Sequence, residues 1–133
     1  MKRYVLDSFA LIAFFENEPG ADKVARILSD INEKKSHGFM SVINWGEIYY
    51  NTMREGGIDE AEKIIKQLNK HSIQIVDANR DLTYRAAKLK AIYHIAYADC
   101  FAAALSSELK ATVVTGDPEF EKLSHEVTIC WVA

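Results

Sequence analysis

Short β-type runs alternate with longer helix-type segments along this chain, and this alternation restricts the folds it can adopt. Five short runs are predicted to be strands because they are rich in Val, Ile and Thr or lie between polar breaks. They are Arg3–Leu6, Gly38–Ser41, Ile73–Val76, Thr112–Thr115 and Val127–Val132. Strands separated by helices require crossover connections, which predicts an α/β fold with a mostly parallel sheet covered on both faces.

Apolar residues at helical spacing predict the helices that separate these strands. The predicted helices are Ser8–Glu16, Ala21–Lys35, Val42–Arg54, Asp59–Lys70, Asp81–His94 and Tyr97–Leu109, and a last short helix begins at Pro118. The Tyr97–Leu109 segment is apolar on nearly all sides, which is typical of a buried helix. Open sheets of this kind bind ligands beyond the carboxyl ends of their strands.

The 133 residues suffice for one ordinary domain, and we expect a single domain over residues 1–133. There are no internal repeats or low-complexity tracts, and only two prolines. With 49% hydrophobic and 26% charged residues, the chain has the composition of a globular protein. This composition excludes a disordered or collagen-like protein. A core of this size needs no disulfide staples.

The amino terminus and the uncharged runs argue against export and membrane insertion. Asp7 follows only three apolar residues, which does not fit a signal peptide. The longest run without a formal charge, Ser36–Gly46, is much shorter than the roughly 20 apolar residues of a membrane span. We therefore expect a soluble, cytoplasmic domain that does not contact a membrane.

The net charge of −3 excludes a generic polyanion-binding protein, which would normally be basic. Such a chain still acts on nucleic acid if its acidic residues gather around a cation. Cys100 and Cys130 have no C-x-x-C spacing and the four histidines are scattered, so neither a zinc site nor a disulfide framework is indicated.

Two acidic residues stand at the carboxyl ends of predicted strands. Asp7 ends the first strand, and Asp117 follows the Thr112–Thr115 strand. Both also fit a purely structural role, because Asp is a favoured N-cap residue and Pro118 suits the first position of a helix.

Two further acidic residues lie in apolar helical segments. Asp99 belongs to the predicted buried helix, where an ionised carboxylate costs several kcal/mol unless it is paired or bound to metal. No Arg or Lys stands three or four residues away on that helix, so the alternatives are a distant basic partner or a helix cap. Glu47 lies between aromatic and aliphatic residues, and its alternative is an exposed helical Glu.

The joint pattern of the four acids indicates a metal site. Carboxylates that are brought together repel one another and raise each other's pKa, unless a hard cation offsets their charge. Mg²⁺ prefers oxygen ligands and is commonly held by a few carboxylates together with substrate phosphate. Such an ion activates water and shields the charge that develops on a phosphodiester. The four residues are Asp7, Glu47, Asp99 and Asp117.

Four segments around these acids resemble the PIN domain, and more closely the VapC-type ribonuclease toxins of prokaryotic VapBC toxin–antitoxin pairs. They are Tyr4–Ala13, Ser41–Glu47, Tyr97–Leu105 and Val113–Phe120, in the order and at the spacing of the family. The chain departs from the family pattern at Tyr97, where a Ser or Thr is common, and at Cys100, where Ala is usual. Neither departure removes an expected ligand.

The resemblance implies a three-layer α/β/α PIN-like domain with a central, mostly parallel sheet of about five strands. It implies a Mg²⁺- or Mn²⁺-dependent endoribonuclease whose catalytic and metal-binding residues are Asp7, Glu47, Asp99 and Asp117. Thr115 stands where the family often has a hydroxyl near the metal, and Ser8 is a weaker candidate of the same kind. The implied partners are an RNA substrate, a cognate VapB-like antitoxin and a second copy of the chain in a homodimer.

The main alternative is a non-catalytic PIN scaffold that only binds a partner protein, although the presence of all four acids argues against it. A haloacid-dehalogenase-like phosphatase would need a second Asp where Phe9 stands. A phosphoacceptor receiver domain would need an acidic pair after the first strand and a Lys at the end of the fifth. The basic residues between Arg80 and Lys90 could contact RNA backbone or form an ordinary solvated helix face.

Overall fold

Five parallel strands form the central sheet of the structure, a computed structural model that describes residues 1–133. Along the sheet the order is β3-β2-β1-β4-β5. The strands are β1 (Lys2–Leu6), β2 (Ser36–Ser41), β3 (Ile73–Val76), β4 (Thr112–Thr115) and β5 (Thr128–Trp131). All four strand pairs are parallel, as the alternation of short and long segments predicts.

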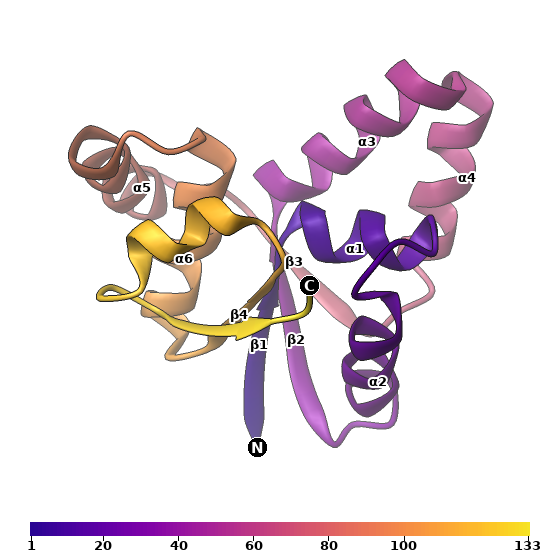
Figure 1. Ribbon diagram of the computed structural model, residues 1–133, viewed down its shortest axis with the longest axis horizontal. Helices are drawn as coiled ribbons and strands as arrows, with labels where there is room; N and C mark the ends of the chain where they lie inside the picture. The colour runs from indigo at the N-terminus through magenta and orange to yellow at the C-terminus, as the bar shows by residue number, and fades with distance from the viewer.

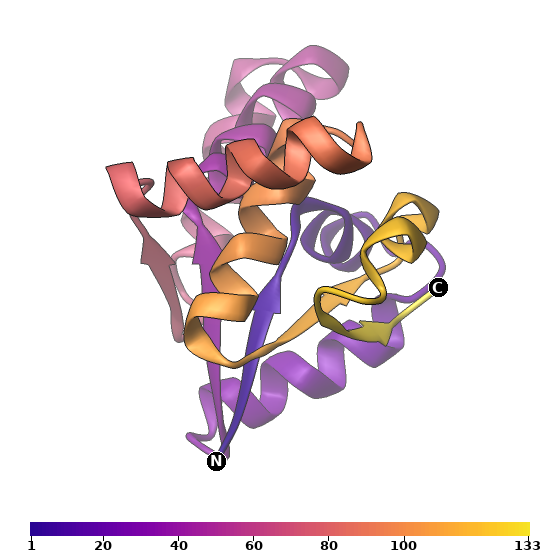
Figure 2. The same ribbon diagram turned by 90° about the vertical axis from the view of Figure 1, so that its left-hand side faces the viewer.

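Helices cover both faces of this sheet (Figures 1 and 2). They are α1 (Ser8–Phe15), α2 (Ala21–Asn32), α3 (Val42–Gly56), α4 (Ile58–Leu68), α5 (Arg80–Tyr93), α6 (Tyr97–Leu109) and the 3₁₀ helix η1 (Pro118–Leu123). None of these helices combines the length and the apolar character that a bilayer crossing requires.

Two separate apolar cores fill the space between the helices and the two faces of the sheet. Residues of α5, α6 and η1 form one core, and residues of α1 to α4 form the other. Consecutive strand residues point to opposite cores: Val5 and Val113 face α5 and α6, whereas Leu6 and Val114 face the opposite core. The three-layer α/β/α prediction is confirmed.

The strand order places a topological switch point between β1 and β4. From β1 the chain builds outward through β2 to β3, and then returns to add β4 on the other side of β1. Leu6 lies beside Val114, so the carboxyl ends of these two strands are neighbours. Ligands of open parallel sheets bind in the crevice that such a reversal creates.

Most predicted boundaries lie within two residues of the observed ones, and α2 is the exception. The predicted helix ends at Lys35, but α2 ends at Asn32. Lys34 adopts a left-handed conformation with φ of 65°, which no continuing α-helix accommodates. The chain then enters β2 at Ser36, two residues before the predicted start of this strand.

The sequence pattern predicts five core residues on strands or on the inner side of helices, Leu6, Ile12, Ile43, Ala103 and Val114. Three of them are fully buried, and two are not. Leu6, Ala103 and Val114 have no exposed surface. Ile12 is only half-buried, because its side chain borders the pocket at the end of the sheet.

Ile43 is also half-buried, because it lies beside the buried side of α3 rather than on it. The buried side of this helix consists of Asn44, Ile48 and Thr52, which are four residues apart. Two of these three are polar, so the hydrophobic pattern alone did not identify the buried side.

We expect Val114→Asp to destabilise the protein by several kcal/mol, because it places an unpaired charge in a strand buried on both faces. Urea unfolding measures the effect. Thr128→Asp on the exposed start of β5 is the matched control and should cost less than about 1 kcal/mol. A Val114→Asp protein that unfolds cooperatively with unchanged stability would contradict the assignment of β4.

Candidate active site

Asp7 lies at the switch point, directly after β1, and it is almost completely buried. It is the N-cap residue of α1, and its Oδ1 accepts a hydrogen bond of 2.9 Å from the backbone N–H of Ala10. Its Oδ2 accepts a hydrogen bond from the Thr115 hydroxyl. The cap predicted from the sequence is therefore present, and it uses only one of the two oxygens.

Thr115 connects the two strand ends that meet at the switch point. Its buried side chain donates to Asp7, and its Oγ1 accepts a hydrogen bond of 3.0 Å from the backbone N–H of Asp117. Asp117 in turn caps η1, since its Oδ1 accepts from the Glu119 N–H at 3.0 Å. A single hydroxyl thus fixes the positions of two of the four predicted acids.

Glu47 enters the site from α3, where its carboxylate accepts hydrogen bonds from α1 and from its own helix. The Ser8 hydroxyl donates to Oε1, and the Tyr50 hydroxyl lies 3.5 Å from Oε2. The contact with Ser8 joins α3 to the first residue of α1, immediately after Asp7.

Asp99 lies in the first turn of α6 and is only 6% exposed. The N-cap of this helix is Ala96, and no ion pair includes Asp99. The structure thus contains neither the helix cap nor the basic partner that are the structural alternatives for this residue. Asn44, fully buried on α3, donates to the Ala98 carbonyl at 3.4 Å and ties the two helices together.

The two buried carboxylates have strongly raised pKa values. Burial raises the pKa of Asp99 to about 8, and the charges of Asp117, Asp7 and Glu47 add to the shift. Burial also raises the pKa of Asp7 to about 7, although the hydrogen bonds from Thr115 and Ala10 oppose it. Ionising both groups at neutral pH therefore requires compensating positive charge.

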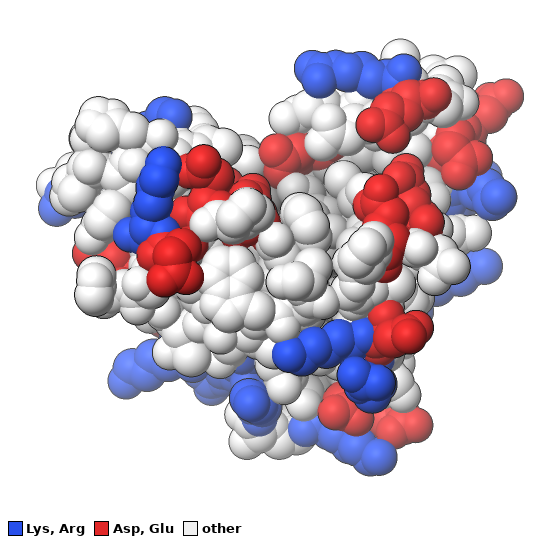
Figure 3. Space-filling model, viewed as in Figure 1, with Lys and Arg blue, Asp and Glu red and all other residues white.

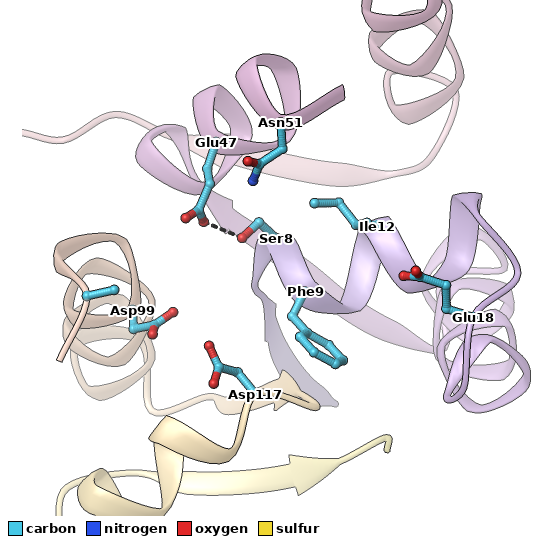
Figure 4. A pocket seen from close by; sticks show the side chains of 9 residues that line it. Ser8, Phe9, Ile12, Glu18, Glu47, Asn51, Asp99 and Asp117 are labelled. Atoms are coloured by element: carbon cyan, nitrogen blue, oxygen red, sulfur yellow. Dashed lines mark hydrogen bonds between the residues drawn. The ribbon is translucent and has the colours of Figure 1, made fainter. Parts of the chain in front are cut away.

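The carboxylates converge on one open pocket of about 220 Å³. Glu47, Asp99 and Asp117 line it together with Ser8, and Figure 4 shows these three carboxylates directed toward the same space from three different elements. Acidic side chains gather around the hollow between α3 and α6 on this face of the molecule (Figure 3). All four predicted acids are thus brought to one place, with Asp7 buried at the end of β1.

The donors suit a hard, hydrated cation. They are carboxylate oxygens without a basic partner, which is the chemistry that Mg²⁺ and Mn²⁺ prefer. The arrangement is open: no three His, Cys, Asp or Glu side chains form a ready-made ligand cluster. Mg²⁺ commonly keeps several waters and takes one or two protein carboxylates, so an open set of oxygen donors fits it.

Sequence reasoning missed the other side of this pocket. Phe9 and Ile12 of α1 and Asn51 of α3 also line it, as does Glu18 at its outer end. The spacing held a signal for two of them: Asn51 lies one turn after Glu47, and Ile12 lies one turn after Phe9, so each pair shares a helix face.

The basic segment between Arg80 and Lys90 does not reach the pocket. Arg85 pairs with Asp81 on the exposed face of α5, and Lys88 lies over the Tyr84 ring. Lys90 donates to the Ile95 carbonyl at 2.6 Å. These contacts fit the solvated helix face that is the alternative to an RNA contact.

Several solved structures have a similar fold. The VapBC2 complex of Rickettsia felis, bound to a promoter DNA fragment, matches with a TM-score of 0.76 and 16% identity over 96% of this chain and 97% of that one. VapBC-1 of nontypeable Haemophilus influenzae matches with a TM-score of 0.71 and 18% identity over 97% of both chains. Mycobacterium tuberculosis VapC20, a toxin that cleaves the sarcin–ricin loop, matches with a TM-score of 0.73 and 13% identity over 90% of this chain and 94% of that one.

A sequence search of curated proteins gives no match. The family model of the PIN domain, in contrast, matches residues 4–126, which include all four acids and every strand except β5 and the first residues of β1. The chain belongs to the PIN domain family.

Proposed function

We propose that this protein is a divalent-metal-dependent endoribonuclease and the toxin of a toxin–antitoxin pair. The observation that carries the nuclease proposal is the pair of buried carboxylates, Asp7 and Asp99, which lie close to Glu47 and Asp117 and have no basic partner. A bound cation stabilises the ionised form of such buried carboxylates, which burial and mutual repulsion otherwise disfavour. Acids at the switch point of a PIN domain fit the hydrolysis of a phosphodiester.

The metal ligands in this proposal are Asp7, Asp99, Glu47 and Asp117, and the ion is Mg²⁺ or Mn²⁺. When bound, such an ion lowers the pKa of water and offsets the negative charge on the scissile phosphate. Asp99 presents its carboxylate from a rigid, buried helix, and Asp7 does so from the end of the central strand. Both side chains are held in place before substrate arrives, which is what efficient positioning requires.

Two hydroxyl groups support the proposed ligands. Thr115 donates to Asp7, which favours the ionised carboxylate and fixes its orientation. Ser8 donates to Glu47 and holds that longer, more flexible side chain toward the pocket. Neither hydroxyl needs to touch the substrate to affect the rate.

The toxin proposal draws on the neighbouring structures, which are VapBC complexes and a VapC toxin. In this proposal the partner is a VapB-like antitoxin that suppresses the ribonuclease, and the active form is a homodimer. Expression of the chain alone should arrest growth of its host, and co-expression of the antitoxin should relieve the arrest.

We expect the purified protein to cleave RNA in Mg²⁺ or Mn²⁺ and to lose this activity in excess EDTA. Asp7→Asn should lower the rate at least about 100-fold, because loss of a ligand costs at least as much as loss of its supporting partner. Gel analysis of a labelled RNA measures both effects.

The control for this experiment is Asp30→Asn, prepared in parallel, which removes an exposed carboxylate on α2 outside the pocket and should leave the rate unchanged. Cleavage that persists at full strength in EDTA would exclude the metal-dependent mechanism. Cleavage by Asp7→Asn at the wild-type rate would point to a contaminating ribonuclease.

We expect metal-free Asp99→Asn to be more stable than metal-free wild type at pH 8. Charge at position 99 is strained by burial and by neighbouring acids, and Asn removes it at nearly constant shape. The melting temperature should rise by roughly 3 °C or more, which corresponds to about 1 kcal/mol. The variant should also lose most of the Mg²⁺-induced rise in melting temperature. A fall of several degrees without metal would indicate a basic partner for Asp99.

The stability of the metal-free protein should fall as the pH rises from about 4 to about 8. In the folded state the pKa of Asp99 is about 8, above its ordinary value of 3.8, so deprotonation is harder in the folded than in the unfolded chain. The stability that the protonated form provides is therefore lost across this range. Chemical unfolding at several pH values, with and without the Asp99→Asn substitution, measures the slope, which the substitution should flatten.

Thr115→Val should lower cleavage about 10- to 100-fold, the usual cost of losing a partner of a metal ligand. It should also move the acidic limb of the pH–rate profile to higher pH, because the lost hydrogen bond no longer opposes the rise in the pKa of Asp7. Thr115→Ser keeps the hydroxyl and should restore both the rate and the profile. A lower rate with an unmoved profile would assign Thr115 a merely structural role.

A further inference from the structure

The pocket has a second half that the proposed ligands do not occupy. Phe9, Ile12 and Asn51 all line it: Ile12 and Asn51 point toward each other from α1 and α3, and the Phe9 ring points toward the loop that carries Asp117 (Figure 4). We call the part of the pocket that these three residues line the apolar half, because Phe9 and Ile12 make up most of it. The Phe9 side chain is 38% exposed although it lines a pocket that also contains four acidic residues. An exposed phenyl ring beside carboxylates contributes nothing to binding a cation, so this half calls for a different explanation.

The Phe9 ring is held in place by the loop that carries Asp117. A Cβ atom at Gly116 would lie 2.3 Å from Cε1 of Phe9 and 2.9 Å from the Cβ of Ala133. Only glycine therefore lets the ring pack this closely against the backbone between Thr115 and Asp117. Because the ring is already ordered, a ligand that stacks on it loses little additional conformational entropy.

Asn51 adds a hydrogen-bonding group to the apolar half. The side-chain hydrogen bonds of α3 involve Ser41, Asn44, Glu47 and Tyr50, which leaves the Asn51 amide free for a ligand. An amide offers donors and an acceptor together. Nucleobase edges present the matching pairs, and Asn is well suited to bidentate contacts with them.

Building on the ribonuclease proposal, we propose that the apolar half binds one unpaired nucleobase next to the scissile phosphate, with Phe9 as the stacking surface and Asn51 as the group that reads the base edge. A nucleotide carries a phosphate for the acidic half and a flat, neutral base for the apolar half. Glu18 at the outer end disfavours a second phosphate there. The whole pocket measures about 220 Å³, so its apolar half has the size for one base, and an unpaired base is the one that is free to enter it.

The test uses a pool of single-stranded RNA oligonucleotides randomised around one position, cut in Mg²⁺ and sequenced at the new ends. Wild type should prefer particular bases at one position beside the cut. Asn51→Ala should flatten that preference and keep the metal-induced rise in melting temperature. Asn69→Ala, which truncates an exposed Asn at the end of α4, is the matched control and should keep the preference.

Phe9→Leu should raise KM for a preferred oligonucleotide by roughly 5- to 150-fold, the range expected for one lost base stack. Phe9→Tyr keeps the ring and should restore KM. An oligonucleotide with an abasic site at the preferred position should be cleaved with the same KM by wild type and by Phe9→Leu. This last comparison separates stacking from a general disturbance of the fold.

The outcomes distinguish the two proposals. Cleavage by wild type with an unchanged base profile in Asn51→Ala and an unchanged KM in Phe9→Leu would overturn the base pocket and leave the ribonuclease standing. If no RNA is cleaved, its binding in Mg²⁺ is measured by fluorescence anisotropy with the same variants. Binding that depends on Phe9 and Asn51 would then support the base pocket and contradict the ribonuclease proposal. Binding that does not depend on them would overturn both proposals. Loss of antitoxin binding alone would assign this half to a protein partner.

Discussion

Burial of like charges at the junction of β1 and β4 is the constraint on which the rest of this structure depends. Asp7 and Asp99 are nearly inaccessible to water, and each lies in the field of further carboxylates. Such an arrangement costs free energy that the remainder of the molecule must offset. Two apolar cores, one on each face of the sheet, supply that stability. The acids gather near the carboxyl ends of β1 and β4, which are neighbours in the sheet.

The sequence predicted the sheet and the acidic site for related physical reasons. Parallel strands are buried on both faces, so they read as short β-branched runs, and residues that follow them must meet at one edge of the sheet. Asp7 and Asp117 could therefore be placed together without a structure. Asp99 was conspicuous for the opposite reason, because a charge on a helix that is apolar all round has no local compensation. Glu47 carried the weakest signal, since a single Glu on a helix is ordinarily exposed.

What the sequence did not reveal depends on how separate elements face one another. Periodicity places Ile12 on the apolar side of α1, yet it does not say that this side ends at an open pocket. Phe9 reads as an ordinary helical aromatic until Gly116, more than a hundred residues later, is seen to make room for its ring. The end of α2 was not predicted because the residue in the left-handed conformation is Lys34 and not a glycine, which is the usual sequence signal for a helix end. In each case a distant contact or a backbone choice overrides the local pattern.

Asp7 and Asp99 lie close enough for their charges to interact but are tied to the fold in different ways. Asp7 starts α1 and accepts a hydrogen bond from the neighbouring strand end, so part of its desolvation cost is recovered within the protein. Asp99 neither caps its helix nor pairs with a basic side chain. No interaction within the chain therefore offsets its desolvation cost to a comparable degree. Without a cation such a carboxyl group is held largely protonated at neutral pH, and a bound cation favours its ionised form. Asp99 therefore carries the argument for a cation at this site more directly than Asp7 does.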